Sequence, residues 1–223
     1  MEIKHLALGM VNAYLVKTGG DWFLIDTGVA MGRAKFEQSI AREGVAPADI
    51  KLVIITHGDL DHIGNCAYLQ KKYGLKIAVH DADAELCRTG TTNFNRRRKA
   101  SPLSKVLRPL LFTLIIKPMM KKFPLEPFEP AIILSDGQHL MDYGFNATVF
   151  HIPGHTMGSI GILTADGDFF SGDTINNRKK PAVADTVENE TALAKSLEKI
   201  RAMRIVNVFP GHGKPFPMAE LTF

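Results

Sequence analysis

The sequence is poor in cysteine, because only Cys66 and Cys87 occur among its 223 residues. Two cysteines are too few for a disulfide framework, and they lack the close pairing of thiolate zinc ligands. We predict that both are small, buried apolar side chains. The shortage therefore argues against disulfide-rich scaffolds and against zinc sites built from cysteine.

Long apolar runs are also missing. The most apolar stretch, 110–116, is much shorter than the roughly 20 residues that cross a bilayer, so it predicts no transmembrane helix. Residues 1–17 include Glu2 and Asn12 and lack the apolar centre of a secretory signal. Repeats and low-complexity linkers are absent as well. We expect one cytoplasmic domain over 1–223, whose 45% hydrophobic and 22% charged residues are ordinary for a globular protein.

Acidic residues are absent between Leu86 and Leu125. Ten of the 27 basic residues lie there, which leaves 17 basic against 23 acidic residues elsewhere, a net charge of −6. The overall charge of +4 therefore belongs to this one segment and does not by itself predict nucleic-acid binding. The segment also lacks the interleaved aromatic residues of a single-strand-binding surface, so we expect no nucleic-acid partner.

The segment 89–130 is interpreted as a basic and apolar insertion. It contains the basic run 96–99, the apolar run 110–116 and six prolines. Three roles are consistent with this composition: a packing extension with a solvated basic rim, a lid over an apolar substrate, or a peripheral contact with an anionic membrane surface. The sequence predicts no oligomeric state.

Short apolar runs separated by glycine and polar turns predict many strands with helices between them. The predicted strands are 3–8, 11–17, 22–25, 52–56, 77–80, 131–134, 147–152, 160–164, 168–171 and 205–209. The predicted helices are 31–42, 64–73, 82–87 and 191–204.

Metal-capable side chains are concentrated just after the predicted strand 52–56. They are His57, Asp59, Asp61 and His62. A strand that ends at Thr56 and opens into a loop can direct all four toward one volume. Imidazole and carboxylate without thiolate suit zinc or another first-row divalent metal. The alternative is an ordinary polar turn that closes a buried strand.

Three further predicted strands end in the same kind of residue. His155 lies in Pro-Gly-His-Thr, Asp173 in Gly-Asp-Thr and His212 in Pro-Gly-His-Gly. Glycine beside each candidate ligand lets the backbone turn sharply and approach an ion closely. Asp26 ends a fifth strand, where it could be a ligand or a carboxylate that orients a ligand histidine.

The motif His-x-Asp-x-Asp-His at 57–62, followed by these separated residues, resembles the metallo-β-lactamase superfamily over nearly the whole chain apart from the insertion. The resemblance implies an α/β (α+β) fold, a four-layer αββα sandwich of two mixed β-sheets flanked by helices. It also implies two divalent metal ions at one edge. By resemblance, the first site uses His57, Asp59 and His155. The second uses Asp61, His62 and His212, and Asp173 bridges the two.

Two details depart from the best-known members of the family. Asp59 stands where the family usually has histidine; zinc is the expected metal, but the extra carboxylate leaves iron or manganese open. Asp173 stands where the well-known zinc β-lactamases have cysteine, so the chain is more similar to the glyoxalase-II-like and lactonase-like branches. In these branches the resemblance implies a metal-bridging hydroxide as nucleophile, oriented by the catalytic carboxylate of Asp61.

The resemblance and the charges together predict a small-molecule substrate that is anionic or acyl-bearing. Hydrolysis of a thioester or similar carboxylic ester is the first hypothesis, with Asn177, Arg178 and Lys180 either binding an anionic group or forming a solvated loop. The alternatives are an acyl-homoserine lactonase, although no tyrosine follows Asp173 as in those enzymes, and a phosphodiesterase acting on a phospholipid or nucleic acid. Two hypotheses outside hydrolysis are an iron oxygen-reductase module and a binding protein without metal.

Overall fold

The computed structural model describes residues 1–92, 96–98, 113–114, 117–122 and 124–223. Its strands are β1 (Glu2–Ala7), β2 (Asn12–Thr18), β3 (Asp21–Ile25), β4 (Ile50–Ile54), β5 (Ile77–His80), β6 (Arg97–Arg98), β7 (Ile132–Leu134), β8 (Ala147–His151), β9 (Ile160–Thr164), β10 (Asp168–Gly172), β11 (Ile175–Asn176), β12 (Ala182–Val183), β13 (Thr186–Val187), β14 (Asn207–Pro210) and β15 (Phe216–Pro217). Its labelled α-helices are α1 (Arg33–Arg42), α2 (Leu60–Ile63), α3 (Cys66–Tyr73), α4 (Asp81–Thr89), α6 (Lys117–Lys122) and α7 (Glu190–Arg201).

Two mixed sheets form the centre of the molecule. The first has the order β1-β2-β3-β4-β5-β7, antiparallel up to β3 and parallel from β3 onward. The second has the order β15-β14-β10-β9-β8, in which only β10 and β14 are parallel neighbours. The predicted sandwich of two mixed sheets flanked by helices is confirmed.

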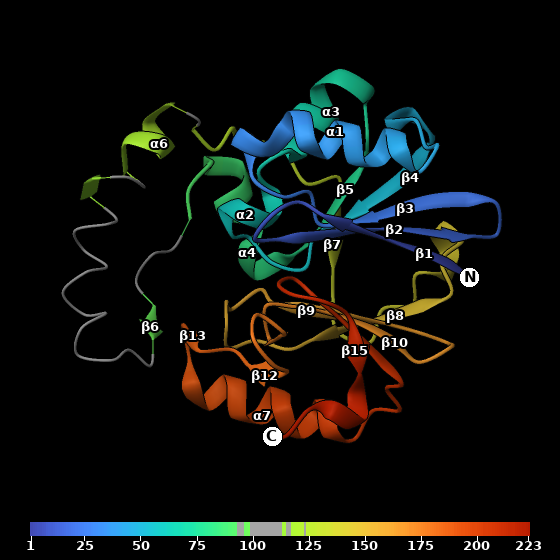
Figure 1. Cartoon of the computed structure of the whole chain (residues 1–223), viewed down its shortest axis with the longest axis vertical. Helices are drawn as coiled ribbons and strands as arrows, with labels where there is room; N and C mark the ends of the chain where they lie inside the picture. The colour runs from blue at the N-terminus through green and yellow to red at the C-terminus, as the bar shows by residue number, and fades with distance from the viewer. Residues whose placement is uncertain (93–95, 99–112, 115–116, 123) are drawn as a thin grey trace.

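Three apolar clusters separate four layers. One lies between the first sheet and helices α1, α3 and α4, one between the two sheets, and one between the second sheet and α7 (Figure 1). Alternation along the strands divides the side chains among them: Leu24 belongs to the first cluster and its neighbour Phe23 to the second, while Phe170 belongs to the second and Phe169 to the third. Apolar side chains therefore pack on both faces of each sheet, and the candidate metal ligands lie in the segments that follow the strands.

The structure corrects the predicted boundaries around the metal-capable motif. Strand β4 ends at Ile54 rather than at Thr56, and the predicted helix 64–73 begins at Cys66 as α3, preceded by the unpredicted four-residue helix α2. Asp59 is the residue before α2, and its carbonyl accepts from the backbone amides of His62 and Ile63. Asp61 and His62 thus lie in a helical turn. Gly64 ends that turn where a Cβ would come within 2.4 Å of the backbone nitrogen of Ala30.

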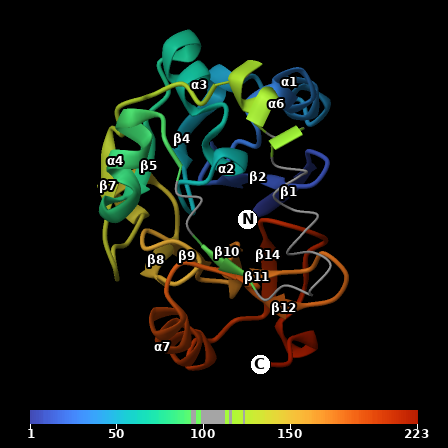
Figure 2. The same ribbon diagram turned by 90° about the vertical axis from the view of Figure 1, so that its left-hand side faces the viewer.

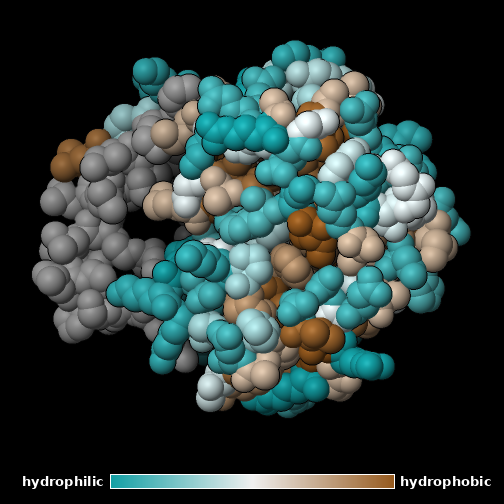
Figure 3. Space-filling view, turned by 45° about the vertical axis from the view of Figure 1, so that its right-hand side comes forward, coloured by the Kyte–Doolittle hydropathy of each residue, from teal (hydrophilic) through white to brown (hydrophobic). Residues whose placement is uncertain are grey.

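Part of the predicted insertion is described, namely β6, α6 and the flanking residues. The apolar run 110–116 falls outside the described residues except for 113–114, and so does most of the surface proposed for a membrane contact. Among the described residues, no helix is long and apolar enough to cross a membrane. On the face shown in Figure 3, hydrophilic side chains cover most of the described surface and apolar ones form separate small patches.

Candidate metal site

The candidate ligands lie where several strands end. Strands β3 and β4 are parallel, as are β10 and β14, and β8 runs with β10 because each is antiparallel to β9. The carboxyl ends of these strands therefore open at one edge of each sheet, and Figure 2 views the molecule from the side on which α2 and β11 lie. The side chains gathered there are His57, Asp59, Asp61, His62, His155, Asp173 and His212.

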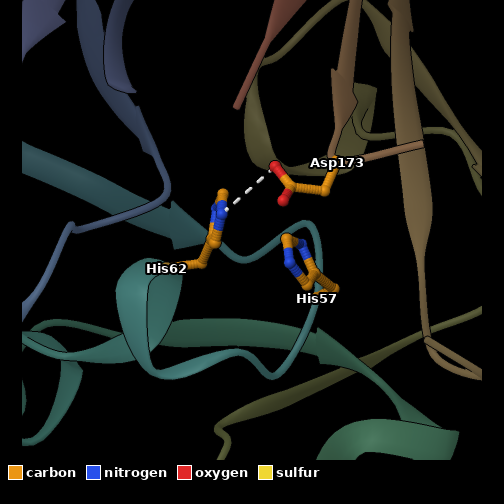
Figure 4. Close-up of side chains that lie close together, drawn as sticks. All are labelled: His57, His62 and Asp173. Atoms are coloured by element: carbon orange, nitrogen blue, oxygen red, sulfur yellow. Dashed lines mark ion pairs between the residues drawn. The ribbon is translucent and has the colours of Figure 1, made fainter. Parts of the chain in front are cut away.

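These side chains form three overlapping groups that could each hold a metal ion, with ligand atoms within 4.8 Å of one another. We call His57, Asp59 and His155 the outer group. The inner group is Asp61, His62 and His212. A third group, His57, His62 and Asp173, joins them (Figure 4). The geometry agrees with the predicted assignment of residues to two sites, and their role as metal ligands stays a prediction.

All four histidines are held by the same ring atom. The Nδ1 atoms of His62, His155 and His212 face Asp26 Oδ2 at 2.8 Å, the Thr186 carbonyl at 2.7 Å and the Met10 carbonyl, respectively. His57 Nδ1 lies 3.0 Å from Thr56 Oγ1. Because that hydroxyl already donates its hydrogen to Asp26, it accepts from the imidazole. Each ring thus donates through Nδ1 and presents the Nε2 lone pair to the shared volume.

The presented atoms are buried and lack hydrogen-bond partners among the described residues. They include the Nε2 atoms of His57, His62 and His212 and Oδ1 of Asp173. His212 Nε2 lies 3.0 Å from Asp173 Oδ2, and His62 Nε2 lies 3.4 Å from Asp173 Oδ1. Nitrogen and carboxylate lone pairs that converge at such distances in a buried place are stabilised by a cation between them. The donor set, imidazole with carboxylate, therefore fits a divalent metal ion.

Charge in the site is shaped by these contacts. Burial alone would raise the pKa of Asp173, but the imidazoles of His212 and His62 hold that pKa well below the usual value. Burial likewise opposes ionisation of Asp59, whose pKa is nevertheless held well below normal by His155, His57 and Arg96. Both carboxylates are therefore negatively charged at neutral pH, as metal ligands must be.

Asp26 is placed to orient a ligand rather than to serve as one. Oδ1 accepts from the Thr56 amide at 2.8 Å, while Oδ2 accepts from Thr56 Oγ1 and from His62 Nδ1, both at 2.8 Å. Among the described residues, Asp26 is the one non-glycine with positive φ, +60°. Both oxygens are taken by protein donors, so of the two roles open at the sequence level the contacts favour orientation of His62.

Asp26→Asn is expected to weaken metal binding by about 10–100-fold, the usual effect of losing a partner behind a ligand. An amide nitrogen facing His62 Nδ1 opposes the present tautomer and ring orientation. Competition with a chromophoric chelator measures the dissociation constant. Asp21→Asn, at the opposite end of β3, is the matched control, and equal affinities for both variants would contradict the assigned role.

Asp83, a buried residue in the first turn of α4, was not predicted from the sequence. Its Oδ2 accepts from the Gly58 amide at 2.7 Å and from Thr156 Oγ1 at 2.9 Å, and its Oδ1 accepts from the Gly158 amide at 3.0 Å. A Cβ at Gly158 would lie 2.3 Å from the carboxyl carbon, so only glycine allows this approach. Asp83 thereby joins the loop of His57 to the loop of His155.

A cavity of about 170 Å³ adjoins these groups. Arg178 lines it, and its Nη2 lies 3.8 Å from Asp173 Oδ2. Asn177 is not part of the lining; its side chain donates to the Lys214 carbonyl at 3.0 Å. Lys180 is exposed and also outside the lining. Of the three predicted substrate-binding residues, the structure thus brings only Arg178 to the cavity.

Arg96 is a second lining residue that sequence reasoning did not single out. The basic run 96–99 suggested a solvated rim, yet the Arg96 side chain is only 5% exposed and forms a bidentate ion pair with Asp59. Nothing in the run itself distinguishes an inward-facing arginine from its neighbours.

The four-layer fold and its histidine–aspartate edge define a class of metal-binding α/β proteins. The sequence profile described as "Metallo-beta-lactamase superfamily" matches residues 6–212, so the chain belongs to the metallo-β-lactamase superfamily. The family resemblance stated from the motifs is thereby confirmed, and membership supports metal-dependent hydrolysis as the general activity.

Similar proteins and solved structures agree with this family assignment. The chain is 28% identical over 212 residues to the Drosophila melanogaster "Beta-lactamase-like protein 2 homolog", covering 93% of this chain and 60% of the relative. It is 28% identical over 175 residues to the human "Acyl-coenzyme A thioesterase MBLAC2", covering 74% and 58%. A metallo-beta-lactamase family protein from Thermus thermophilus has a TM-score of 0.70 at 23% identity, covering 96% and 74%. The chain thus spans about 60% of the length of these curated relatives.

Proposed function

We propose that the chain is a metal-dependent hydrolase that cleaves a thioester or similar carboxylic ester bond. The observation that carries this proposal is the set of buried Nε2 and carboxylate lone pairs that converge beside a cavity. Zinc is the proposed metal, and iron or manganese remain alternatives because Asp59 adds a carboxylate.

A bound divalent ion supplies a polarised substrate oxygen and a water whose pKa falls to about 7. The residues of the chain do the rest. We assign to Asp61 the orientation of that water and the acceptance of its proton. Its Oδ2 faces the inner-group nitrogens His212 Nε2 at 3.5 Å and His62 Nε2 at 4.0 Å, and its side chain is 32% exposed and lines the cavity. The guanidinium of Arg178 at the cavity is suited to an anionic part of the substrate.

The thioester is preferred for two reasons. One relative matched over 74% of this chain is named an acyl-coenzyme A thioesterase, and an acyl-coenzyme A carries the anionic groups that an arginine at the cavity suits. The lactonase alternative lacks the tyrosine after Asp173, where this chain has Thr174. The phosphodiesterase alternative rests on the basic segment, most of which falls outside the described residues.

Four substrates assayed in parallel test the proposal: an acyl-coenzyme A, S-lactoylglutathione, an acyl-homoserine lactone and bis-nitrophenyl phosphate. We expect thiol release from one or both thioesters to exceed turnover of the other two, to stop on chelation and to return with added zinc. Turnover confined to the lactone or the phosphodiester would overturn the thioester assignment. Chelator-resistant thioester turnover would overturn the metal dependence.

A further inference from the structure

The outer group of the site already contains a cation that belongs to the chain. Arg96 directs Nη1 to Asp59 Oδ2 and Nη2 to Asp59 Oδ1, so both carboxylate oxygens are engaged by one guanidinium. Nη1 also lies 3.3 Å from His155 Nε2. Two of the three outer-group residues are therefore in contact with the guanidinium, and His155 Nε2 also lies 3.1 Å from Asp59 Oδ2.

The unpartnered atoms are distributed unevenly between the groups. Among the described residues, the buried ligand atoms without a hydrogen-bond partner include His62 Nε2, His212 Nε2 and Asp173 Oδ1, which lie in or beside the inner group. In the outer group, as far as the structure describes it, only His57 Nε2 is in this state. The buried lone pairs that lack a partner among the described residues are thus concentrated at the inner group.

Backbone pairing between two short strands fixes the chain next to Arg96. Strand β6 follows directly and pairs with β13, with Arg98 opposite Thr186 and Arg97 opposite Val187. The carbonyl of Thr186 is also the acceptor for His155 Nδ1, at 2.7 Å. The same two-stranded ribbon therefore orients His155 and delivers Arg96 beside it.

The carboxylate of Asp59 explains the ion pair with Arg96. A carboxylate offers two parallel oxygens to a guanidinium fork, whereas the imidazole usual at this position in the family offers one neutral lone pair. Arginine does not lose its proton in proteins, so the outer group keeps this positive charge. A divalent ion placed there as well would compete for the same lone pairs and repel the guanidinium.

We propose that Arg96 takes the place of the outer cation, so that the chain binds one divalent ion, at the inner group, instead of the two that the family resemblance implies. The inference rests on the metal dependence of the proposed function but not on its substrate. Its consequence is a mixed site in which one metal ion and one fixed guanidinium face the same cavity.

Metal counting tests this without reference to activity. The chain is stripped with chelator, incubated with excess Zn²⁺ or Mn²⁺ and gel-filtered, and bound metal is measured by mass spectrometry. We expect about one ion per chain for the wild type and about two for Arg96→Ala, whose Asp59 and His155 are free. Arg178→Ala is the matched control, because it removes an arginine from the same cavity without freeing Asp59, and it should stay at one.

A second pair of measurements keeps the test decisive if Arg96→Ala folds poorly. Asp59→His removes the partner of Arg96 and restores an imidazole, so it should also bind two ions. In the Mn²⁺ form, electron paramagnetic resonance should show an isolated ion in the wild type and a spin-coupled pair in the variant. Two ions in the wild type, or one in both Arg96→Ala and Asp59→His, would overturn the proposal. Absence of metal from every form would instead overturn the metal dependence itself.

Discussion

Asp173→Ala is expected to lower hydrolysis by more than about 100-fold, beyond the 10–100-fold typical of losing a partner behind a metal ligand. Asp173 is a carboxylate close to three of the imidazoles, with oxygens 3.0 Å from His212 Nε2, 3.4 Å from His62 Nε2 and 3.7 Å from His155 Nε2. Its removal takes away one of the negative charges that balance a divalent ion beside those nitrogens, so both metal affinity and rate should fall.

Thermal unfolding separates this loss from misfolding. Metal at 100 times its dissociation constant stabilises the folded wild type by about 2.7 kcal/mol, which raises its melting temperature. Asp173→Ala should fold without metal and show a much smaller shift when metal is added. The matched control is Asp166→Ala, in the exposed turn before β10, the strand that Asp173 follows. It should behave like the wild type in both assays. Metal-dependent stabilisation and turnover retained by Asp173→Ala would refute the central place given to this carboxylate.

The sequence was most informative about residues whose signals are local. Strands β9 and β10 were predicted almost to the residue because apolar alternation and a Gly-containing turn both lie within the hairpin. The boundary at Asp59 was missed because the start of α2 depends on a carbonyl that accepts two amides, and no apolar period marks a four-residue helix. The two-residue strands β6 and β13 were missed for the same reason, since so short a pair has no periodicity.

The candidate site likewise contains residues with a local sequence signal and residues whose role depends on contacts distant in the chain. The histidines and aspartates were found because they follow apolar strands, and most of them, namely His57, Asp59, His155, Asp173 and His212, stand beside a glycine. Asp83 and Arg96 were missed because their partners, the amides of Gly58 and Gly158 and the carboxylate of Asp59, are distant in the chain. An aspartate in a first helical turn and an arginine in a basic run both have ordinary local explanations. Tertiary contacts alone distinguish them from solvated residues.

Asp83→Ala is expected to destabilise the folded chain by about 3 kcal/mol or more, because each buried donor left without an acceptor costs about 1–3 kcal/mol and three donors converge on this carboxylate. For a chain of this length, that corresponds to a melting temperature lower by roughly 6–12 °C. Urea titration followed by circular dichroism measures the free energy of unfolding.

Asp81→Ala is the matched control, since Asp81 lies in the same helical turn but is exposed. It removes only the favourable interaction with the helix dipole, about 0.3–1 kcal/mol. Asp83→Asn, which keeps the volume but replaces one acceptor oxygen with a donor, should fall between the two. Because Asp83 joins the loops of His57 and His155, which border the cavity, turnover should follow the same order as stability. Equal unfolding free energies for Asp81→Ala and Asp83→Ala would mean that the two loops hold their positions without this carboxylate, and the structural account of the site would then have to rest on the strand ends alone.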